Sequence, residues 1–166
     1  MKSLFDIQVN GFAGVDFQQA GLTAADLRKA VDGLAEQETL RFFATLITDS
    51  IEALGGKLAN FERLRSSDPA IAAAVCGYHI EGPWLSPEPG YRGAHDPRHM
   101  GAPSLTDFEK IQRVAGERIR LLTLAPELPG SAEFIREVSA SGVAVSIGHS
   151  NASDADIDAA INAGAR

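Results

Sequence analysis

Apolar residues in this chain alternate between short continuous runs and longer segments in which they recur at helical spacing. This alternation is typical of β-α units that build a parallel sheet, because each crossover helix packs back onto the strands. The runs contain few polar interruptions, as expected for strands that are covered on both faces. The sequence therefore predicts five strands, each followed by a helix. The predicted strands are Leu4–Val9, Arg41–Thr48, Ala70–Ile80, Ile119–Ala125 and Val143–Ile147.

Hydroxyl side chains mark the expected helix starts. Thr23 can cap a helix in which Asp26 lies three residues later, where a carboxylate is favoured by the helix dipole. The predicted buried stripe of that helix is Leu27, Ala30, Val31 and Leu34. Later starts are expected at Ser50, Ser104, Ser131 and Ser153 or Asp154, with Gly142 and Gly164 at C-terminal caps.

Charge and cysteine content limit the function classes. The formal net charge of −7 leaves no broad positive surface for nucleic acid, so no nucleic-acid partner is expected. The longest apolar stretch, Ala70–Cys76, is far shorter than the roughly 18 residues of a membrane span. Cys76 is the only cysteine, which excludes an intrachain disulfide, and its apolar strand predicts a buried thiol. We expect a cytoplasmic, soluble protein without a membrane partner.

Two architectures fit five β-α units. An open doubly wound sheet suits 166 residues better than a (β/α)₈ barrel, which usually needs about 250. However, the residues after the first strand, Asn10–Gly14, lack the glycine pattern of a dinucleotide-binding turn, and no phosphate-binding loop pattern occurs. The Pro/Gly-rich segment Gly82–Pro103 is longer than ordinary βα loops, which makes it a candidate functional loop. Length and these motifs leave both architectures open.

Polar residues cluster where the predicted strands end. Gln8 and Asn10 share one face of the first strand, His79 and Glu81 share one face of the third, and His149 follows the fifth. In both architectures ligands bind beyond these carboxyl ends. A buried Glu81 carboxylate needs a cation or a hydrogen-bond partner. Imidazole and carboxylate suit zinc or ferrous iron, whereas hydrogen bonding between Glu81, His149 and the backbone is the alternative.

The long segment contributes two further histidines and a tryptophan. His95 follows Gly93-Ala94, where the backbone can approach a ligand closely, so His95 is a candidate site residue. His99 is interpreted as a solvated loop residue, and Trp84 as a packing anchor for the loop.

Five ordered motifs resemble a known family, the N-acetylglucosamine-6-phosphate deacetylases of the amidohydrolase superfamily. The resemblance extends over essentially the whole chain. The motifs are Asp6-Ile7-Gln8-Val9-Asn10-Gly11, His79-Ile80-Glu81-Gly82-Pro83-Trp84, Arg92-Gly93-Ala94-His95-Asp96-Pro97, Leu124-Ala125-Pro126-Glu127 and Gly148-His149-Ser150-Asn151-Ala152.

The resemblance implies a fold and an activity. The fold is an α/β, parallel TIM barrel of the amidohydrolase type, truncated to about five β-α units. Residues 1–166 would form a single partial catalytic domain, without the family's small β-sandwich and without the C-terminal barrel units. The activity is metal-dependent hydrolysis of N-acetylglucosamine 6-phosphate to glucosamine 6-phosphate and acetate. The partner is thus a small amino-sugar phosphate, and the full-length enzyme is expected to be a homo-oligomer.

The resemblance also assigns site residues. It implies that Glu81 and His149 are metal ligands, with Gln8 contacting the metal through a water, and that Ala94 and His95 contact the sugar. Zinc is the expected divalent metal, with iron as the alternative. Amides at Gln8 and Asn10 replace a histidine pair that holds a second metal in other superfamily members, so one metal is expected.

The resemblance leaves part of the expected site outside the chain. The aspartate that acts as general acid and base, and a third metal ligand, are expected beyond Arg166. The 166 residues alone are therefore expected to be nearly inactive and prone to self-association. The alternatives are a related amidohydrolase with another acyl substrate and a non-catalytic sugar-binding module.

Overall fold

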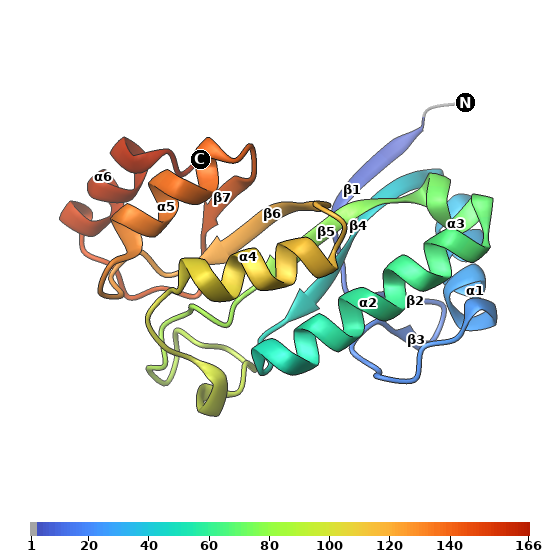
Figure 1. Ribbon diagram of the computed structural model, residues 1–166, viewed down its shortest axis with the longest axis horizontal. Coiled ribbons are helices and arrows are strands. Elements are labelled where there is room, and N and C mark those ends of the chain that lie inside the picture. Colours follow the sequence, from blue (N-terminus) through green and yellow to red (C-terminus); the bar gives the residue numbers. More distant parts are fainter. Residues whose placement is uncertain (1–2) are drawn as a thin grey trace.

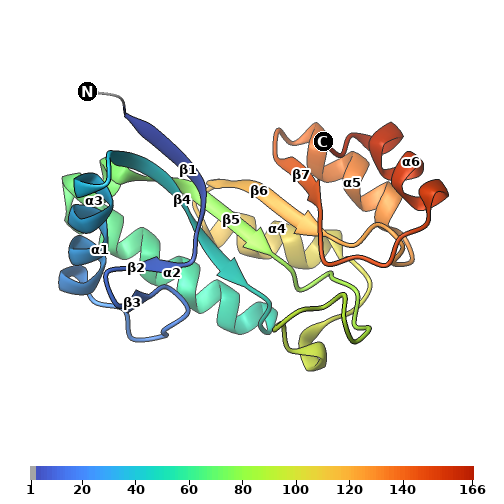
Figure 2. The same ribbon diagram turned by 180° about the vertical axis from the view of Figure 1, so that it is seen from behind.

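A computed structural model, which describes residues 3–166, shows a curved five-stranded parallel sheet. Each strand pairs with the next parallel strand along the chain, in the order β1-β4-β5-β6-β7, with no reversal. The helices lie on one face of the sheet, as the two opposite views show (Figure 1, Figure 2). A doubly wound sheet has helices on both faces and a strand-order reversal. The structure therefore confirms the barrel-wall prediction. The strands of this sheet are β1 (Leu4–Val9), β4 (Thr39–Ile47), β5 (Val75–Glu81), β6 (Ile119–Leu124) and β7 (Ala144–Ile147).

Helices follow each of these strands. They are α1 (Ala24–Glu36), α2 (Ile51–Ser67), α3 (Pro69–Ala74), α4 (Leu105–Val114), α5 (Ser131–Ala140) and α6 (Asp154–Ala163), and a short 3₁₀ helix, η1, covers Pro97–His99. The Thr23–Asp26 capping box of α1 is present, and its buried residues are the four predicted ones. Ser50, Ser104 and Ser153 cap α2, α4 and α6 as predicted. No helix among residues 3–166 is long and apolar enough to cross a membrane.

The main core lies between the sheet and the helices. Phe42, Ala44 and Leu46 of β4 and Tyr78 and Ile80 of β5 have no exposed surface. Their neighbours in sequence point to the opposite, concave side, because side chains alternate along a strand. Thus Thr45 and His79, which are register partners, lie on the concave side.

Several details differ from the predictions. Residues 70–74 belong to helix α3 instead of a strand, because Pro69 begins the helix, Asp68 caps it, and alanine favours helix. Helix α5 begins after Gly130, and the Ser131 hydroxyl donates to the carbonyl of Ala125 instead of capping the helix. A small unpredicted hairpin, β2 (Gly11–Phe12) and β3 (Val15–Asp16), follows β1.

The burial of Cys76 and of Trp84 tests two further predictions. Cys76 is only partly buried; it lies near the start of β5, where the pairing with β4 is irregular and passes from Val75 directly to Gly77. The prediction of a buried thiol was wrong. Trp84 is buried and packs edge-on against Phe134 of α5, 4.8 Å between ring centroids. Its interpretation as a packing anchor is confirmed.

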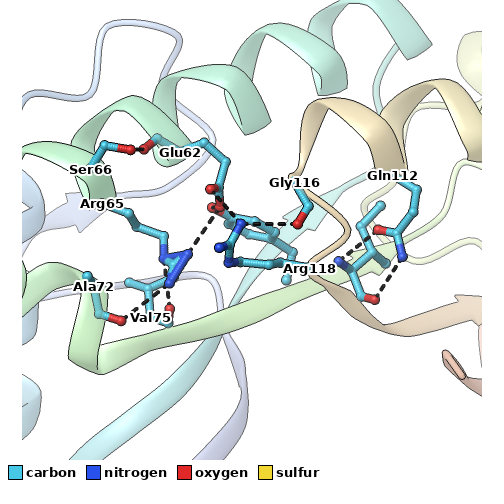
Figure 3. A network of polar contacts seen from close by, with 10 residues as sticks. Glu62, Arg65, Ser66, Ala72, Val75, Gln112, Gly116 and Arg118 are labelled. Carbon is cyan, nitrogen blue, oxygen red and sulfur yellow. Dashed lines mark hydrogen bonds and ion pairs between the residues drawn. The ribbon is translucent and has the colours of Figure 1, made fainter.

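A polar network fastens α2 to the amino ends of β5 and β6 (Figure 3). Glu62 of α2 accepts hydrogen bonds from the hydroxyl of buried Tyr78 and from Arg118, the latter at 3.0 Å. Arg65 donates to Glu62 at 3.2 Å and to the Val75 carbonyl at 3.0 Å. Burial and the Glu62 carboxylate raise the pKa of Tyr78, so this hydroxyl stays a donor.

Candidate metal and substrate site

A hollow of about 530 Å³ lies on the concave side of the sheet, at the carboxyl ends of its strands. Strand β1, strand β5, the long loop after β5 and the loop after β7 all contribute side chains to it. The lining includes every residue that the sequence singled out as a metal or sugar contact. These residues are Gln8, Glu81, Ala94, His95 and His149, and Asn10, Asp16, Gln18 and Ile47 complete the lining.

Glu81 ends β5 between Ile47 of β4 and Thr123 of β6. Only 9% of its surface is exposed, and Gln8 Nε2 donates to Glu81 Oε2 at 3.2 Å. The next residue, Gly82, has φ +90°, and a Cβ at this position would overlap the Thr48 hydroxyl. Glycine at position 82 therefore lets the chain turn directly after the carboxylate.

His149 approaches the other oxygen of the same carboxylate. Its Nε2 lies 3.1 Å from Glu81 Oε1, and its Nδ1 lies 3.2 Å from the carbonyl oxygen of Tyr91. A carbonyl only accepts, so Nδ1 carries a proton and donates it. In the neutral ring, Nε2 and Oε1 are then two acceptors facing each other. This arrangement requires a proton shared between the two atoms or a metal cation beside both.

His149 also has an unusual backbone, with φ +51°. This left-handed conformation costs a residue with a Cβ about 1–2 kcal/mol. Gly93 makes room for the ring, since a Cβ at position 93 would lie 3.2 Å from His149 Cε1. The long loop and the β7 loop thus fit closely against each other.

His95 lies beside His149, with 4.4 Å between the two ring centroids, and is held by Thr48. Its Nδ1 lies 2.8 Å from Thr48 Oγ1, and the Thr48 hydroxyl donates to the Glu81 carbonyl at 3.4 Å. His95 Nδ1 is therefore the donor, which leaves its Nε2 as an acceptor. Burial lowers the pKa of His95, repulsion from His149 lowers it further, and Glu81 acts in the opposite direction. The side chain is thus suited to remain a neutral imidazole.

The donor set fits a divalent metal. One ligand atom from each of Glu81, His95 and His149 lies within 4.8 Å of the other two. Two ligands of a tetrahedral zinc ion lie about 3.3 Å apart, given bond lengths of about 2.0–2.1 Å. The 3.1 Å between Glu81 Oε1 and His149 Nε2 is close to that separation. Carboxylate with imidazole is also the chemistry that zinc and ferrous iron accept.

Two other histidines do not line the hollow. His79 is buried below Glu81, with Nε2 2.8 Å from Thr123 Oγ1 and Nδ1 3.3 Å from Thr45 Oγ1. Burial lowers the pKa of His79 to about 4. His99 lies 3.8 Å from Asp49 in a partly exposed position, consistent with its interpretation as a loop residue.

Sequence reasoning missed several supporting groups. Thr48 orients His95, and the Tyr91 carbonyl orients His149. Glu127 stood in a quoted motif without a role, yet its carboxylate contacts the loop that carries His149. Their positions were a usable signal, because Thr48 directly follows β4 and Glu127 comes three residues after the end of β6. A main-chain carbonyl has no sequence signal.

The curved wall of parallel strands, with a carboxylate and imidazoles at its carboxyl ends, corresponds to part of a (β/α) barrel, as in the deacetylase structures that it matches. No protein-family model matches the chain. The chain is similar, over nearly its whole length, to N-acetylglucosamine-6-phosphate deacetylases, as the motifs predicted.

Three comparisons carry this similarity. The deacetylase of Bos taurus is 36% identical, with 96% of this chain and 39% of the relative covered. An N-acetylgalactosamine-6-phosphate deacetylase of Shewanella is 34% identical, with coverages of 99% and 40%. The structure of a mutant Mycobacterium smegmatis deacetylase in complex with N-acetyl-D-glucosamine-6-phosphate matches with a TM-score of 0.86 at 29% identity, covering 98% of this chain and 40% of that one. The chain spans about two fifths of the length of these relatives.

Proposed function

We propose that the protein hydrolyses the N-acetyl group of N-acetylglucosamine 6-phosphate, giving glucosamine 6-phosphate and acetate. The carrying observation is the pairing of Glu81 Oε1 with His149 Nε2 at 3.1 Å inside a hollow that also holds His95. The names of the similar proteins support the substrate class. The Shewanella relative makes N-acetylgalactosamine 6-phosphate the second candidate substrate.

In this proposal Glu81 and His149 hold one divalent metal, zinc in the first instance and iron as the alternative. A metal bound there polarises an acyl carbonyl and lowers the pKa of an attacking water. Gln8 donates to Glu81 Oε2 and so leaves Oε1 directed to His149. The amide oxygen of Gln8 remains free to accept from a water in the hollow.

His95 and Ala94 form the proposed sugar contacts. Because His95 Nδ1 donates to Thr48, the Nε2 atom can accept from a sugar hydroxyl. Ala94 adjoins it in the lining of the same hollow and presents only a methyl group, which leaves space for a ligand. Together the two residues orient a polar, ring-shaped substrate beside Glu81.

Acetate release from N-acetylglucosamine 6-phosphate by the complete gene product tests the proposal, with the metal content of each variant measured in parallel. Glu81→Ala and His149→Ala are expected to lose metal and at least about 100-fold in kcat/KM. His95→Ala is the matched imidazole deletion. The assignment of His95 to the sugar predicts that this variant keeps the metal and loses kcat/KM, whereas loss of the metal would make His95 a third ligand, which the three-residue cluster also allows. Unchanged metal content and acetate release in both Glu81→Ala and His149→Ala would reject the assignment.

A parallel assay with N-acetylgalactosamine 6-phosphate decides between the two sugars. A higher kcat/KM for the galactosamine compound would assign the second candidate. Absence of acetate release from both sugar phosphates by a metal-loaded protein would reject the deacetylase proposal and leave a binding module.

We further propose that this stretch forms one part of a single catalytic barrel domain and that the protein acts in the cytoplasm as a homo-oligomer. The free thiol of Cys76 supports a reducing compartment. The exposed apolar side chains of β1 support association.

A further inference from the structure

We propose that Glu127 is a positioning residue for His149, which it fixes through the two residues that follow the histidine in the chain. This inference rests on the proposed function, because it assumes that His149 is a metal ligand.

Glu127 lies just after β6 and reaches across to the loop after β7. Its Oε2 accepts from the Ser150 hydroxyl at 2.7 Å, and its Oε1 accepts from the Asn151 amide at 2.8 Å. Both oxygens of one carboxylate therefore contact consecutive residues directly after His149. Hydrogen bonds to an ionised acceptor are shorter and stronger than neutral ones, so this is a firm attachment.

The backbone of His149 depends on such an attachment. The residue is held in a left-handed conformation, and Gly148 before it has no room for a side chain, because a Cβ there would lie 2.7 Å from Thr123 Cγ2. Between these constraints and the Glu127 contacts, the chain on both sides of His149 is fixed. Release of residues 150 and 151 would let the strained residue relax and turn its ring.

Besides Glu81 and the His95 ring, whose centroid lies 4.4 Å from its own, His149 is contacted by main-chain atoms. The Ser86 amide donates to the His149 carbonyl at 2.9 Å, and the ring donates to the Tyr91 carbonyl. Because the Ser86 amide and the Tyr91 carbonyl belong to the main chain, a side-chain substitution does not remove them. Glu127 is a side chain that acts on the same loop, with Glu88 as a second tie through Asn151 Nδ2 at 3.0 Å.

Small movements of His149 matter, because Nε2 must stay beside Glu81 Oε1. Groups that orient a metal ligand typically change metal affinity 10- to 100-fold when they are altered. Glutamine at position 127 keeps the shape but carries no charge, so its oxygen accepts from the Asn151 amide in a weaker, neutral hydrogen bond. Its NH₂ group then faces the Ser150 hydroxyl, which must accept instead of donate and loses its own acceptor. Both attachments are thus weakened without creating a cavity.

The test is a Co²⁺ titration of the complete protein, followed by its visible absorption spectrum at saturation. Glu127→Gln is expected to weaken Co²⁺ binding about 10- to 100-fold and to shift the absorption bands of the bound ion. Ser150→Ala, which removes one of the two contacts, is expected to give a smaller weakening in the same direction. Glu133→Gln on the exposed side of α5 is the matched control and should change neither quantity.

His149→Ala, measured alongside, separates the two levels of the argument. If His149→Ala abolishes binding while Glu127→Gln and Ser150→Ala leave affinity and spectrum unchanged, the positioning role is wrong and the metal assignment stands. If His149→Ala itself leaves Co²⁺ binding unchanged, the proposed function fails. A Glu127→Gln protein that does not fold leaves Ser150→Ala to decide, by the same two readouts.

Discussion

Three histidines near the concave side of the sheet are held by different partners. Threonine hydroxyls hold both ring nitrogens of His79, one threonine holds His95, and a backbone carbonyl holds His149. These partners leave His79 with no free nitrogen, whereas His95 and His149 each keep Nε2 for other chemistry. The hydrogen-bond partner, more than the residue type, therefore separates the structural histidine from those of the site.

His79 makes the stability of the fold depend on pH. Its pKa is about 4 in the folded chain, below the ordinary value of 6.5, so the unfolded chain binds the proton more tightly. The free energy of unfolding is therefore at its full value above pH 6.5, where His79 is neutral in both states. It falls by up to about 3 kcal/mol as the pH is lowered towards 4, because the unfolded chain takes up the proton first. Urea unfolding of the wild type and His79→Gln between pH 7 and 4.5 measures this. The variant should show the shallower pH dependence, with His99→Gln unchanged as the control, and equal slopes would contradict the prediction.

At the scale of single residues, the sequence predicted what side-chain chemistry reveals. Glu81 at the end of an apolar strand required a partner, and the structure supplies Gln8 and His149. The motifs placed His95 and Ala94 in the same site, and both line the hollow. The carbonyl of Tyr91 was beyond reach, because every residue has one and only the folded loop brings this one to His149.

Among the secondary-structure elements, α2 is tied most heavily by polar groups to the sheet. Glu62 accepts from Tyr78, Arg65 and Arg118, so one carboxylate joins the helix to β5 and to the start of β6. The Tyr78 ring is fully buried and cannot turn its hydroxyl to solvent. Loss of the acceptor thus leaves a buried donor unsatisfied.

Glu62→Ala is therefore expected to lower the free energy of unfolding by about 1–3 kcal/mol. In a Tyr78→Phe background the same substitution should have a smaller effect, because the stranded hydroxyl is gone. Urea denaturation of the two single variants and the double variant gives the coupling. Glu52→Ala serves as the control, since Glu52 pairs with Lys110 at an exposed position and should matter by less than about 0.5 kcal/mol. Strict additivity would show that Glu62 and Tyr78 do not act together.

Elements were predictable where local signals agreed with the tertiary context. The capping box at Thr23 and the apolar stripe of α1 gave the helix and its buried face. Residues 70–74 were assigned to a strand because continuous apolar character does not distinguish a buried strand from a short buried helix. The deciding signals are local: Asp68 caps the helix and Pro69 begins it. The β2–β3 hairpin is too short to carry a periodic pattern.

For the molecule as a whole, the outer strand β1 is the most exposed part of the sheet. Among residues 3–166 it pairs only with β4, and Leu4, Phe5 and Ile7 are each about half exposed. An unpaired strand edge with apolar side chains is a template for association with another chain. The edge residues of β1 are thus where contacts between copies are expected first.

The purified 166-residue chain is expected to self-associate through β1. Ile7→Lys places a charge on this edge and should weaken association about tenfold or more. Burial of an isoleucine side chain is favourable by about 1.5–3 kcal/mol, and a loss of about 1.4 kcal/mol is a tenfold change in the dissociation constant. Sedimentation velocity over a concentration series measures the effect. Ile161→Lys on α6 removes an equally exposed isoleucine away from that edge and should leave association unchanged. A monodisperse monomer in the wild type would disprove the prediction.

The strand order has a consequence for how the chain is made. Each strand of the sheet pairs with the one synthesised before it, as in Thr45 with His79 and Glu81 with Thr123. A nascent chain that leaves the ribosome from its N-terminus can therefore extend the sheet one edge at a time, with every new strand meeting a neighbour already exposed. Loop-closure entropy changes only slowly with loop length, so the long segment before β6 adds little to the barrier. The segments that carry Glu81 and His95 are thus synthesised before the segment that carries His149.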